Sequence, residues 1–442
     1  MTAEIRWLWS RLNANYWFYP ALFSIAGALL AVGLIWLDRH GFAEWLNQVP
    51  EIAPARPEGA SNMLTVIAAS MIGVASTVFS ITIAAVAYAS GTYGPRLLTN
   101  FMEDKGNQLS LATFIGTFVY AITVLRTVRA EDEVAPTAVD AAATSLPGFV
   151  PQLSLLVAYL LMGLSVAVLV YFLNHIPASI QINTVLKGIG QRLIEHVRTD
   201  FPDPDCGREP ERAPAGRPVL ARNTGYVQMI DFDDLAALGQ THGCVVALKV
   251  RTGDFVHPGI PLAELSGVDR LDHAGVDELD DAFIVGATRT PRQDPDFLID
   301  ELVEIALRAL SPAINDPFTA ITALHWLGAA TAELGQRDLS RHARVEQSGR
   351  RVLPMPDDFA HYVERGFGNM RSAVSTSPPA ALVAFDTLRS AALPIADEKR
   401  RGLLHAEGGR LIEQARLELA GPDLADVEAR YEEFSRTFPP AR

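Results

Sequence analysis

Four long apolar runs near the start of the chain are the feature that most constrains its fold. They contain no charged residue and cover Pro20–Leu37, Asn62–Ala89, Leu109–Leu125 and Leu153–Leu173. A helix of about 20 such residues crosses the hydrocarbon core of a bilayer, which is about 30 Å thick. We therefore predict an α-helical membrane domain over residues 1–175, with spans at about 20–37, 62–89, 109–125 and 153–173.

The charge of the chain is concentrated after these runs. The formal net charge is -14, of which residues 1–174 carry -3 and the remainder -11. A nucleic-acid-binding surface is rich in lysine and arginine, so the acidic part argues against nucleic acid as a partner. The two cysteines, Cys206 and Cys244, are too few for a disulfide framework.

The orientation in the membrane depends on a small difference in basic residues. The N-terminal tail and each of the loops between the runs hold two Lys or Arg residues, which is nearly a tie. Lys187, Arg192 and Arg198 follow the last run and favour the cytosolic side. Because four spans put both termini on one side, we expect a multi-pass protein of the bacterial inner membrane with both termini in the cytoplasm.

The second run has a face of small and hydroxyl residues. Gly73, Thr77, Ser80 and Ala84 recur at intervals of three and four residues. This pattern is typical of a hydroxyl-lined path for ions, and equally of close packing between helices in lipid. Arg96 follows at the expected membrane edge, where it either anchors the span or binds a lipid phosphate or a partner carboxylate.

The part of the chain after residue 175 predicts a soluble α+β domain. We expect a connecting helix at 176–199 kinked at Pro177, a Pro-rich linker at 200–218, a β-rich module at 219–292 and a helical domain at 293–442. The stretch "GDFVHPGIPLAEL" is similar to the end of lipoyl- and biotinyl-type barrel-sandwich modules. In those modules the modified lysine lies on an exposed hairpin tip, whereas Lys249 lies inside an apparent strand. We therefore predict a structural module that carries no cofactor, and no pair at zinc spacing accompanies His242 and Cys244.

The stretch "RALSPAINDPFTA" predicts a corner between two helices. Asp294–Pro295 and Asp316–Pro317 are each typical of a helix start, with aspartate as the N-cap and proline in the first turn. Pro312 disfavours helix at Ser311, so the first helix ends there. Arg308, Ser311 and Asn315 supply more polar groups than a cap needs. We expect Arg308 and Asp316 to hold the soluble domain together, with a neighbouring subunit or a ligand as the alternative partner.

These motifs together resemble a known family. The four spans, "GPRLLTNF", "TRTPRQDPDF" and "RALSPAINDPFTA" are similar to a bacterial family of predicted membrane proteins catalogued only as a domain of unknown function. The resemblance implies an integral membrane protein with no assigned reaction. The motif residues, with a structural or ligand-binding role, are Arg289, Gln293, Asp294, Arg308, Ser311, Asn315 and Asp316.

Two functions are compatible with this organisation. The first is a homo-oligomeric ion channel or passive conduit, lined by the second span and controlled by a cytosolic domain. The alternative is a membrane-anchored sensor or scaffold whose soluble domain binds a ligand or a partner protein. An enzyme is disfavoured because the sequence has no evident nucleophile–base pair or glycine-rich phosphate loop. The expected partners are the lipid bilayer, further copies of the chain and inorganic ions.

Overall fold

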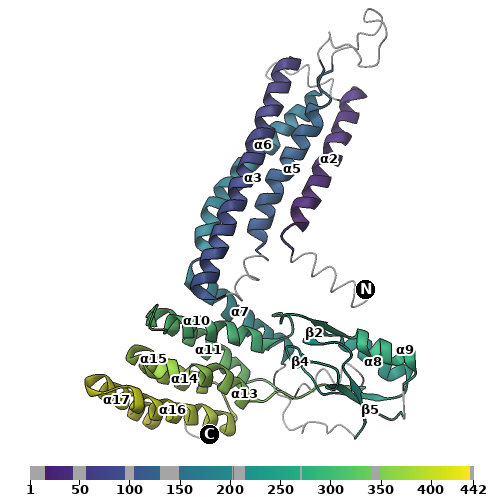
Figure 1. Ribbon diagram of the computed structural model, residues 1–442. Helices are drawn as coiled ribbons and strands as arrows, with labels where there is room; N and C mark the ends of the chain where they lie inside the picture. Colours follow the sequence, from purple (N-terminus) through teal and green to yellow (C-terminus); the bar gives the residue numbers. More distant parts are fainter. Residues whose placement is uncertain are drawn as a thin grey trace, which may run out of the picture. The chain divides into compact units, whose positions relative to one another are not determined.

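The chain forms two units, each with its own core (Figure 1). The computed structural model describes residues 15–42, 56–94, 104–129, 149–201, 203, 215–268, 271–340, 349 and 351–438. Contacts separate a membrane unit, which runs to Gln181, from a soluble unit, which begins at Ile182. The predicted fold class is confirmed, because four helices of membrane length precede a region of small sheets and helices.

The membrane unit consists of four helices that are each long and apolar enough to cross a membrane. They are α2 (Phe18–Arg39), α3 (Pro57–Tyr93), α5 (Lys105–Leu125) and α6 (Gln152–Ser179). Each extends beyond its apolar run because polar residues continue or cap it. Asp104 accepts hydrogen bonds from the backbone N–H groups of Gly106 and Asn107 at the start of α5. Asp38, in the last turn of α2, accepts them from Leu153 and Ser154 at the start of α6.

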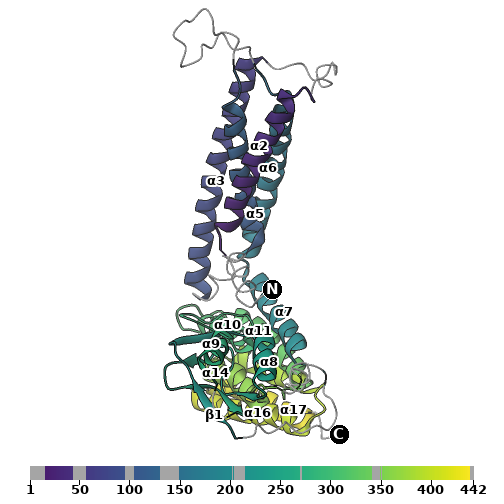
Figure 2. The same ribbon diagram turned by 90° about the vertical axis from the view of Figure 1, so that its right-hand side faces the viewer.

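Helix α5 lies at the centre of the membrane unit and packs against the other three helices (Figures 1 and 2). The large side chains of Phe114, Tyr120 and Phe172 are fully buried in the core. Helices α2 and α5 approach closely, since a Cβ atom on Gly27 would lie 2.5 Å from the carbonyl oxygen of Gly116. Close packing of small residues in this subunit is therefore found between α2 and α5, at Gly27 and Gly116.

The β-rich part of the soluble unit contains two open sheets, and no closed barrel occurs among the described residues. The first sheet has the order β1 (Arg217–Leu220), β5 (Pro261–Ser266), β3 (Val245–Leu248) and β7 (Val352–Leu353). The second has the order β4 (Phe255–Val256), β2 (Gly225–Ile230) and β6 (Phe283–Gly286). All strand pairs are antiparallel except β3 with β7.

Three features of this part differ from the sequence expectation or refine it. Helices α8 (Phe232–Thr241) and α9 (His273–Asp281) lie within the stretch expected to be β-rich. Strand β7 comes from the stretch expected to be helical, because its two residues complete the free edge of β3. Lys249 directly follows β3, where its backbone N–H donates to the carbonyl of Leu262 and its ammonium lies 2.9 Å from Glu264.

The rest of the soluble unit is helical. It contains α7 (Ile182–Asp200), α10 (Pro295–Ala309), α11 (Pro317–Gly335), α13 (Phe359–Val363), α14 (Asn369–Ser375), α15 (Pro378–Ala392), α16 (Glu398–Glu418) and α17 (Gly421–Thr437). A π-helical turn, η2 (Glu364–Gly368), joins α13 to α14. The expected kinked connecting helix is instead interrupted. Helix α6 ends two residues after Pro177, and α7 begins at Ile182.

Candidate functional site

Two helices of the soluble unit begin with the same local structure. The triplet Gln293, Asp294 and Pro295 leads into α10 as Asn315, Asp316 and Pro317 lead into α11, and each proline is the first residue of its helix. The first residue of each triplet has a left-handed backbone, with φ of 60° and 50°. Each aspartate then accepts a hydrogen bond from the backbone N–H two positions beyond the proline, at 3.1 and 3.2 Å. Both predicted caps are thus confirmed.

The two caps differ in what surrounds the carboxylate. Asp294 is only 1% exposed, and Arg289 donates to both of its oxygens at 2.7–2.9 Å. Asp316 is partly exposed and accepts a 2.6 Å hydrogen bond from the Thr319 hydroxyl. A bidentate arginine–carboxylate pair is stronger and more directional than a single neutral hydrogen bond. The first cap therefore connects the start of α10 to Arg289 in the loop after β6.

Arg289 belongs to a network of charged side chains that surrounds the start of α10. Its Nη1 atom lies 2.7 Å from Asp300, which also accepts two 2.8 Å hydrogen bonds from Arg365. Arg365 in turn lies 3.2 Å from Asp296, to which His361 donates at 2.9 Å. The network therefore joins the loop after β6, helix α10, helix α13 and the π-helical turn.

Gln293 attaches this loop to the second sheet. Its side-chain carbonyl accepts from the backbone N–H of Ile230 at 3.1 Å, and its amide donates to the Ile230 carbonyl at 3.4 Å. The side chain thus imitates a strand residue at the end of β2. This placement requires the left-handed backbone at Gln293, which costs about 1 kcal/mol or more for a residue with a side chain.

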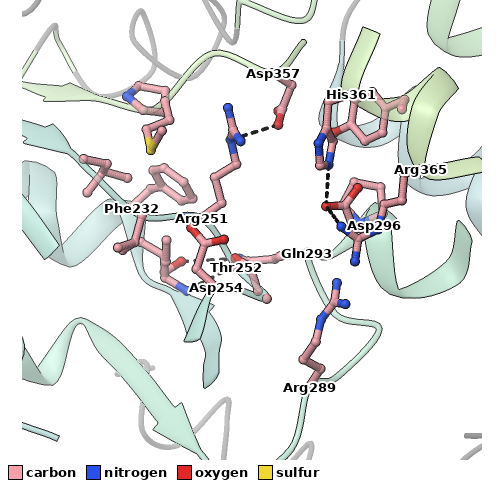
Figure 3. Close-up of a pocket in the computed structure, with 18 residues that line it drawn as sticks. Phe232, Arg251, Thr252, Asp254, Arg289, Gln293, Asp296, Asp357, His361 and Arg365 are labelled. Carbon is pink, nitrogen blue, oxygen red and sulfur yellow. Dashed lines mark hydrogen bonds and ion pairs between the residues drawn. The ribbon is translucent and has the colours of Figure 1, made fainter. Parts of the chain in front are cut away.

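A cavity of about 130 Å³ opens beside the network (Figure 3). Arg251 and Asp357, 3.1 Å apart, lie on one side of it, and His361, Asp296 and Arg365 lie on the other. Its remaining lining is partly apolar and includes Ile230, Phe232, Leu248, Val250, Met355 and Tyr362. The cavity therefore offers arginine and histidine N–H groups next to an apolar wall, which suits a small ligand with a negative or polar group.

The ion pairs and burial shift the pKa values of the site. The hydrogen bond to Asp296 raises the pKa of His361, so the imidazole keeps its proton to a higher pH than free histidine. Burial alone would raise the pKa of Asp296, but the hydrogen bond from His361 and the charge of Arg365 outweigh it and lower this pKa. Burial raises the pKa of Asp294 to about 6, although Arg289 opposes this effect.

The seven motif residues occupy two separate places in the soluble unit. Arg289, Gln293 and Asp294 form one end of the charged network, at the start of α10. Arg308, Ser311, Asn315 and Asp316 lie at the other end of α10, about 22 Å away for a helix of this length. The two motifs "TRTPRQDPDF" and "RALSPAINDPFTA" therefore do not form one site.

The corner at the end of α10 is held by local hydrogen bonds. Ser311 donates through its hydroxyl to the Arg308 carbonyl at 2.6 Å, and its own carbonyl accepts from the Asn315 N–H at 2.9 Å. The Asp316 N–H donates to the Ala309 carbonyl at 2.8 Å. The guanidinium of Arg308 lies 3.7 Å from Glu304, so the contacts described for Arg308 and Asp316 are with other partners than each other.

Sequence reasoning missed four of the six members of the charged network. Asp296 and Asp300 could have been noticed, because acidic residues four apart share one face of a helix. His361 and Arg365 had no such signal, since they follow more than 60 residues later in an ordinary amphipathic stretch. Arg365 lies in the π-helical turn, and such turns are frequent at functional sites.

Among the described residues, no group of three or more His, Cys, Asp or Glu side chains could hold a metal ion.

The predicted pore-lining residues lie on the outer face of α3. Gly73, Thr77, Ser80 and Ala84 are all exposed, whereas Thr82 and its neighbours on the opposite face are buried against the bundle. Among the described residues, no atom outside the helix lies within 4 Å of a Cβ built on Gly73. The Thr77 and Ser80 hydroxyls donate to backbone carbonyls one turn earlier, at 3.0 and 2.9 Å. Arg96 lies outside the described residues.

The chain matches known proteins along most of its length. Uncharacterized proteins of Mycobacterium bovis and Mycobacterium tuberculosis are each 32% identical over 375 residues, a match that covers 82% of this chain and 70% of theirs. No solved structure matches the chain. A family model described as "Predicted membrane protein (DUF2254)" matches residues 13–390. With four membrane-length helices ahead of a soluble unit, the chain belongs to this family of predicted membrane proteins.

Proposed function

We propose that the protein is a homo-oligomeric channel or passive conduit, in which α3 helices of several subunits line a path for ions or small solutes. One observation carries the proposal. The stripe of Gly73, Thr77, Ser80 and Ala84 lies on the face of α3 that the other three helices leave uncovered. Small residues allow helices from neighbouring subunits to approach closely in lipid, and hydroxyl groups can contact ions or water.

A path through one subunit is unfavourable, which supports a path between subunits. Phe114, Tyr120 and Phe172 fill the core of the membrane unit and are fully buried. The Thr77 and Ser80 hydroxyls each use their proton for a backbone carbonyl, so their oxygen lone pairs remain available to a cation or to water. The acidic soluble unit would raise the local concentration of cations near the mouth of such a path.

The proposal is tested by flux and cross-linking with the full-length protein in liposomes. We expect Thr77→Leu and Ser80→Leu to reduce the flux of small cations, because the larger apolar side chain of leucine would fill the shared path. The matched control is Ile83→Leu, an equal-volume change at an exposed position of α3 outside the stripe. Absence of flux for cations, anions and neutral solutes alike would reject the conduit.

The oligomer is tested separately from the flux. In a background without native cysteines, Ser80→Cys should form disulfide-linked dimers under mild oxidation. Ile72→Cys, also exposed on α3 but away from the stripe, should form far fewer. Equal cross-linking at the two positions would show that α3 does not use this face for assembly.

The cavity favours a second candidate function, a membrane-anchored sensor whose soluble unit binds a small ligand. Arg251, Arg365 and His361 line it beside an apolar wall. Hydrogen exchange of α13 and the π-helical turn would be measured with inorganic phosphate and with citrate as anionic probes. Protection that Arg365→Gln abolishes would support a ligand site, and no protection by either probe would argue against an anion sensor.

The proposal also includes the side of the membrane on which the soluble unit lies. We place it in the cytoplasm, on the bacterial inner membrane, because Lys187, Arg192 and Arg198 follow the last span. Alkaline phosphatase fused after Arg442 should be inactive and green fluorescent protein at the same site fluorescent. The opposite result would place the soluble unit outside.

A further inference from the structure

The corner between α10 and α11 exposes two apolar side chains close together. Phe318 is 74% exposed and Ile314 is 45% exposed, although Thr319 and Ala320 next to them are buried. A single exposed apolar side chain is common on a protein surface and needs no explanation. This pair is informative because of its position relative to the start of α7 within the soluble unit.

Helices α7 and α11 run side by side in the same direction (Figure 1). Gly190 of α7 faces the ring of Trp326 in α11. About two turns further along both helices, Arg198 lies 2.9 Å from Glu333. At about 1.5 Å per residue, Ile182 lies about 12 Å before Gly190, and Phe318 lies about 12 Å before Trp326. The exposed corner is therefore at the same end of the soluble unit as the start of α7.

Helix α10 also packs against α7, in agreement with this placement. Arg192 of α7 lies 3.6 Å from Glu301 in the middle of α10. Since α10 and α11 are joined by the corner and run in opposite directions, the C-terminal end of α10 also points toward the start of α7. The corner is thus fixed to that end by contacts on two helices.

The start of α7 is joined to a helix of membrane length by a short stretch of chain. Helix α6, which is long and apolar enough to cross a membrane, ends at Ser179. Only Ile180 and Gln181 separate it from the first residue of α7. Two residues and their flanking bonds span about 10 Å at most. The start of α7 therefore stays within a short distance of the end of a membrane-spanning helix.

We propose that this corner is a membrane-surface contact, in which Phe318 and Ile314 enter the interfacial region of the lipid bilayer. Aromatic side chains are enriched at this depth, where an apolar ring leaves water while the neighbouring backbone stays hydrated. The exposed Lys187 lies at the same end and suits a lipid phosphate group. The proposal does not depend on whether the protein conducts ions.

Site-directed spin labelling of the full-length protein in phospholipid vesicles tests the contact. With Cys206 and Cys244 replaced by serine and alanine, single labels are placed by Phe318→Cys and Ile314→Cys. Accessibility is measured to oxygen, which concentrates in lipid, and to a water-soluble nickel chelate. The matched control is Leu393→Cys, which is 65% exposed but belongs to the opposite end of α11, because Ile395 packs against Gly335.

We expect the ratio of oxygen to nickel accessibility to be severalfold higher for labels at Phe318 and Ile314 than for the label at Leu393. A ratio at the corner equal to that at Leu393 would overturn the proposal, because the corner would then lie in water. Low accessibility to both reagents at the corner would also overturn it, since that result indicates a protein partner instead of lipid. The label at Ile314 keeps the test valid if the change at Phe318 disturbs α11.

Discussion

Replacing Asp294 by alanine compares two helix caps that share one local structure. Asp294 and Asp316 each follow a residue with positive φ, precede a proline and accept a backbone hydrogen bond. Loss of an aspartate N-cap costs about 1 kcal/mol of stability. If local structure alone set the energy, Asp294→Ala and Asp316→Ala would therefore be equally destabilising.

The surroundings of the two carboxylates predict a large difference. Asp294→Ala also leaves Arg289, which is 15% exposed, with Asp300 as its remaining carboxylate partner. Removing one partner of a buried ion pair costs about 3–5 kcal/mol, and the remaining contact with Asp300 places this case at the lower limit of about 3 kcal/mol. We expect Asp294→Ala to lower the free energy of unfolding by about 4 kcal/mol, because the loss of the cap adds about 1 kcal/mol to the loss of the ion pair. Asp316→Ala loses only the cap and should lower it by about 1 kcal/mol.

The unfolding of the soluble unit can be followed through Cys244, which is fully buried in the β-rich core. With Cys206 changed to serine, the thiol of Cys244 becomes reactive only when that core opens. The full-length protein would be titrated with urea in detergent micelles. For an m-value of about 3 kcal/mol per M, a difference of about 3 kcal/mol separates the two midpoints by about 1 M.

A third variant distinguishes the charge from the hydrogen bonds. Asp294→Asn keeps the cap and an acceptor for Arg289 but removes the negative charge. Because burial raises the pKa of Asp294 to about 6, the desolvation of the charge offsets much of its attraction to arginine. We expect Asp294→Asn to cost less than about 1 kcal/mol. Equal urea midpoints for the two alanine variants would refute the reasoning, because burial of the ion pair would then contribute nothing.

Three further changes test the packing and the pH response. Gly190→Leu should destabilise the soluble unit by about 1–3 kcal/mol, since a Cβ there would lie 2.5 Å from the Trp326 ring, whereas Gly188→Leu, with no atom within 4 Å, should not shift the urea midpoint. Gly27→Leu should reduce the monodisperse fraction in size-exclusion chromatography, and Gly33→Leu, where space is open, should leave it unchanged. The stability from the raised pKa of His361 is fully present below about pH 6.5 and lost as the pH rises through the raised value. His361→Gln should therefore flatten the fall in urea midpoint that occurs as the pH rises above about 6.5. A fall of equal size in the variant would show that another group is responsible.

The sequence by itself determined the features that depend on neighbouring residues. Charge-free apolar runs predicted the four membrane-length helices, because the length and composition of a segment decide whether it can cross a bilayer. The Asp-Pro pairs predicted the starts of α10 and α11, because an N-cap bonds to an N–H group only three residues away. The ends of the spans were less accurate, since capping groups such as Asp38 act on a helix more than 100 residues later.

Only the tertiary structure decided which residues meet. Asp300 and Arg365 are 65 positions apart, and no periodicity links a residue of α10 to one in a π-helical turn. The "RALSPAINDPFTA" motif and the charged network lie apart because they are at opposite ends of α10, which is a rigid helix. The outward direction of Gly73 and its neighbours follows from which face of α3 packs on α5. Such pairings depend on how whole elements pack, and a local pattern of residues carries no information about them.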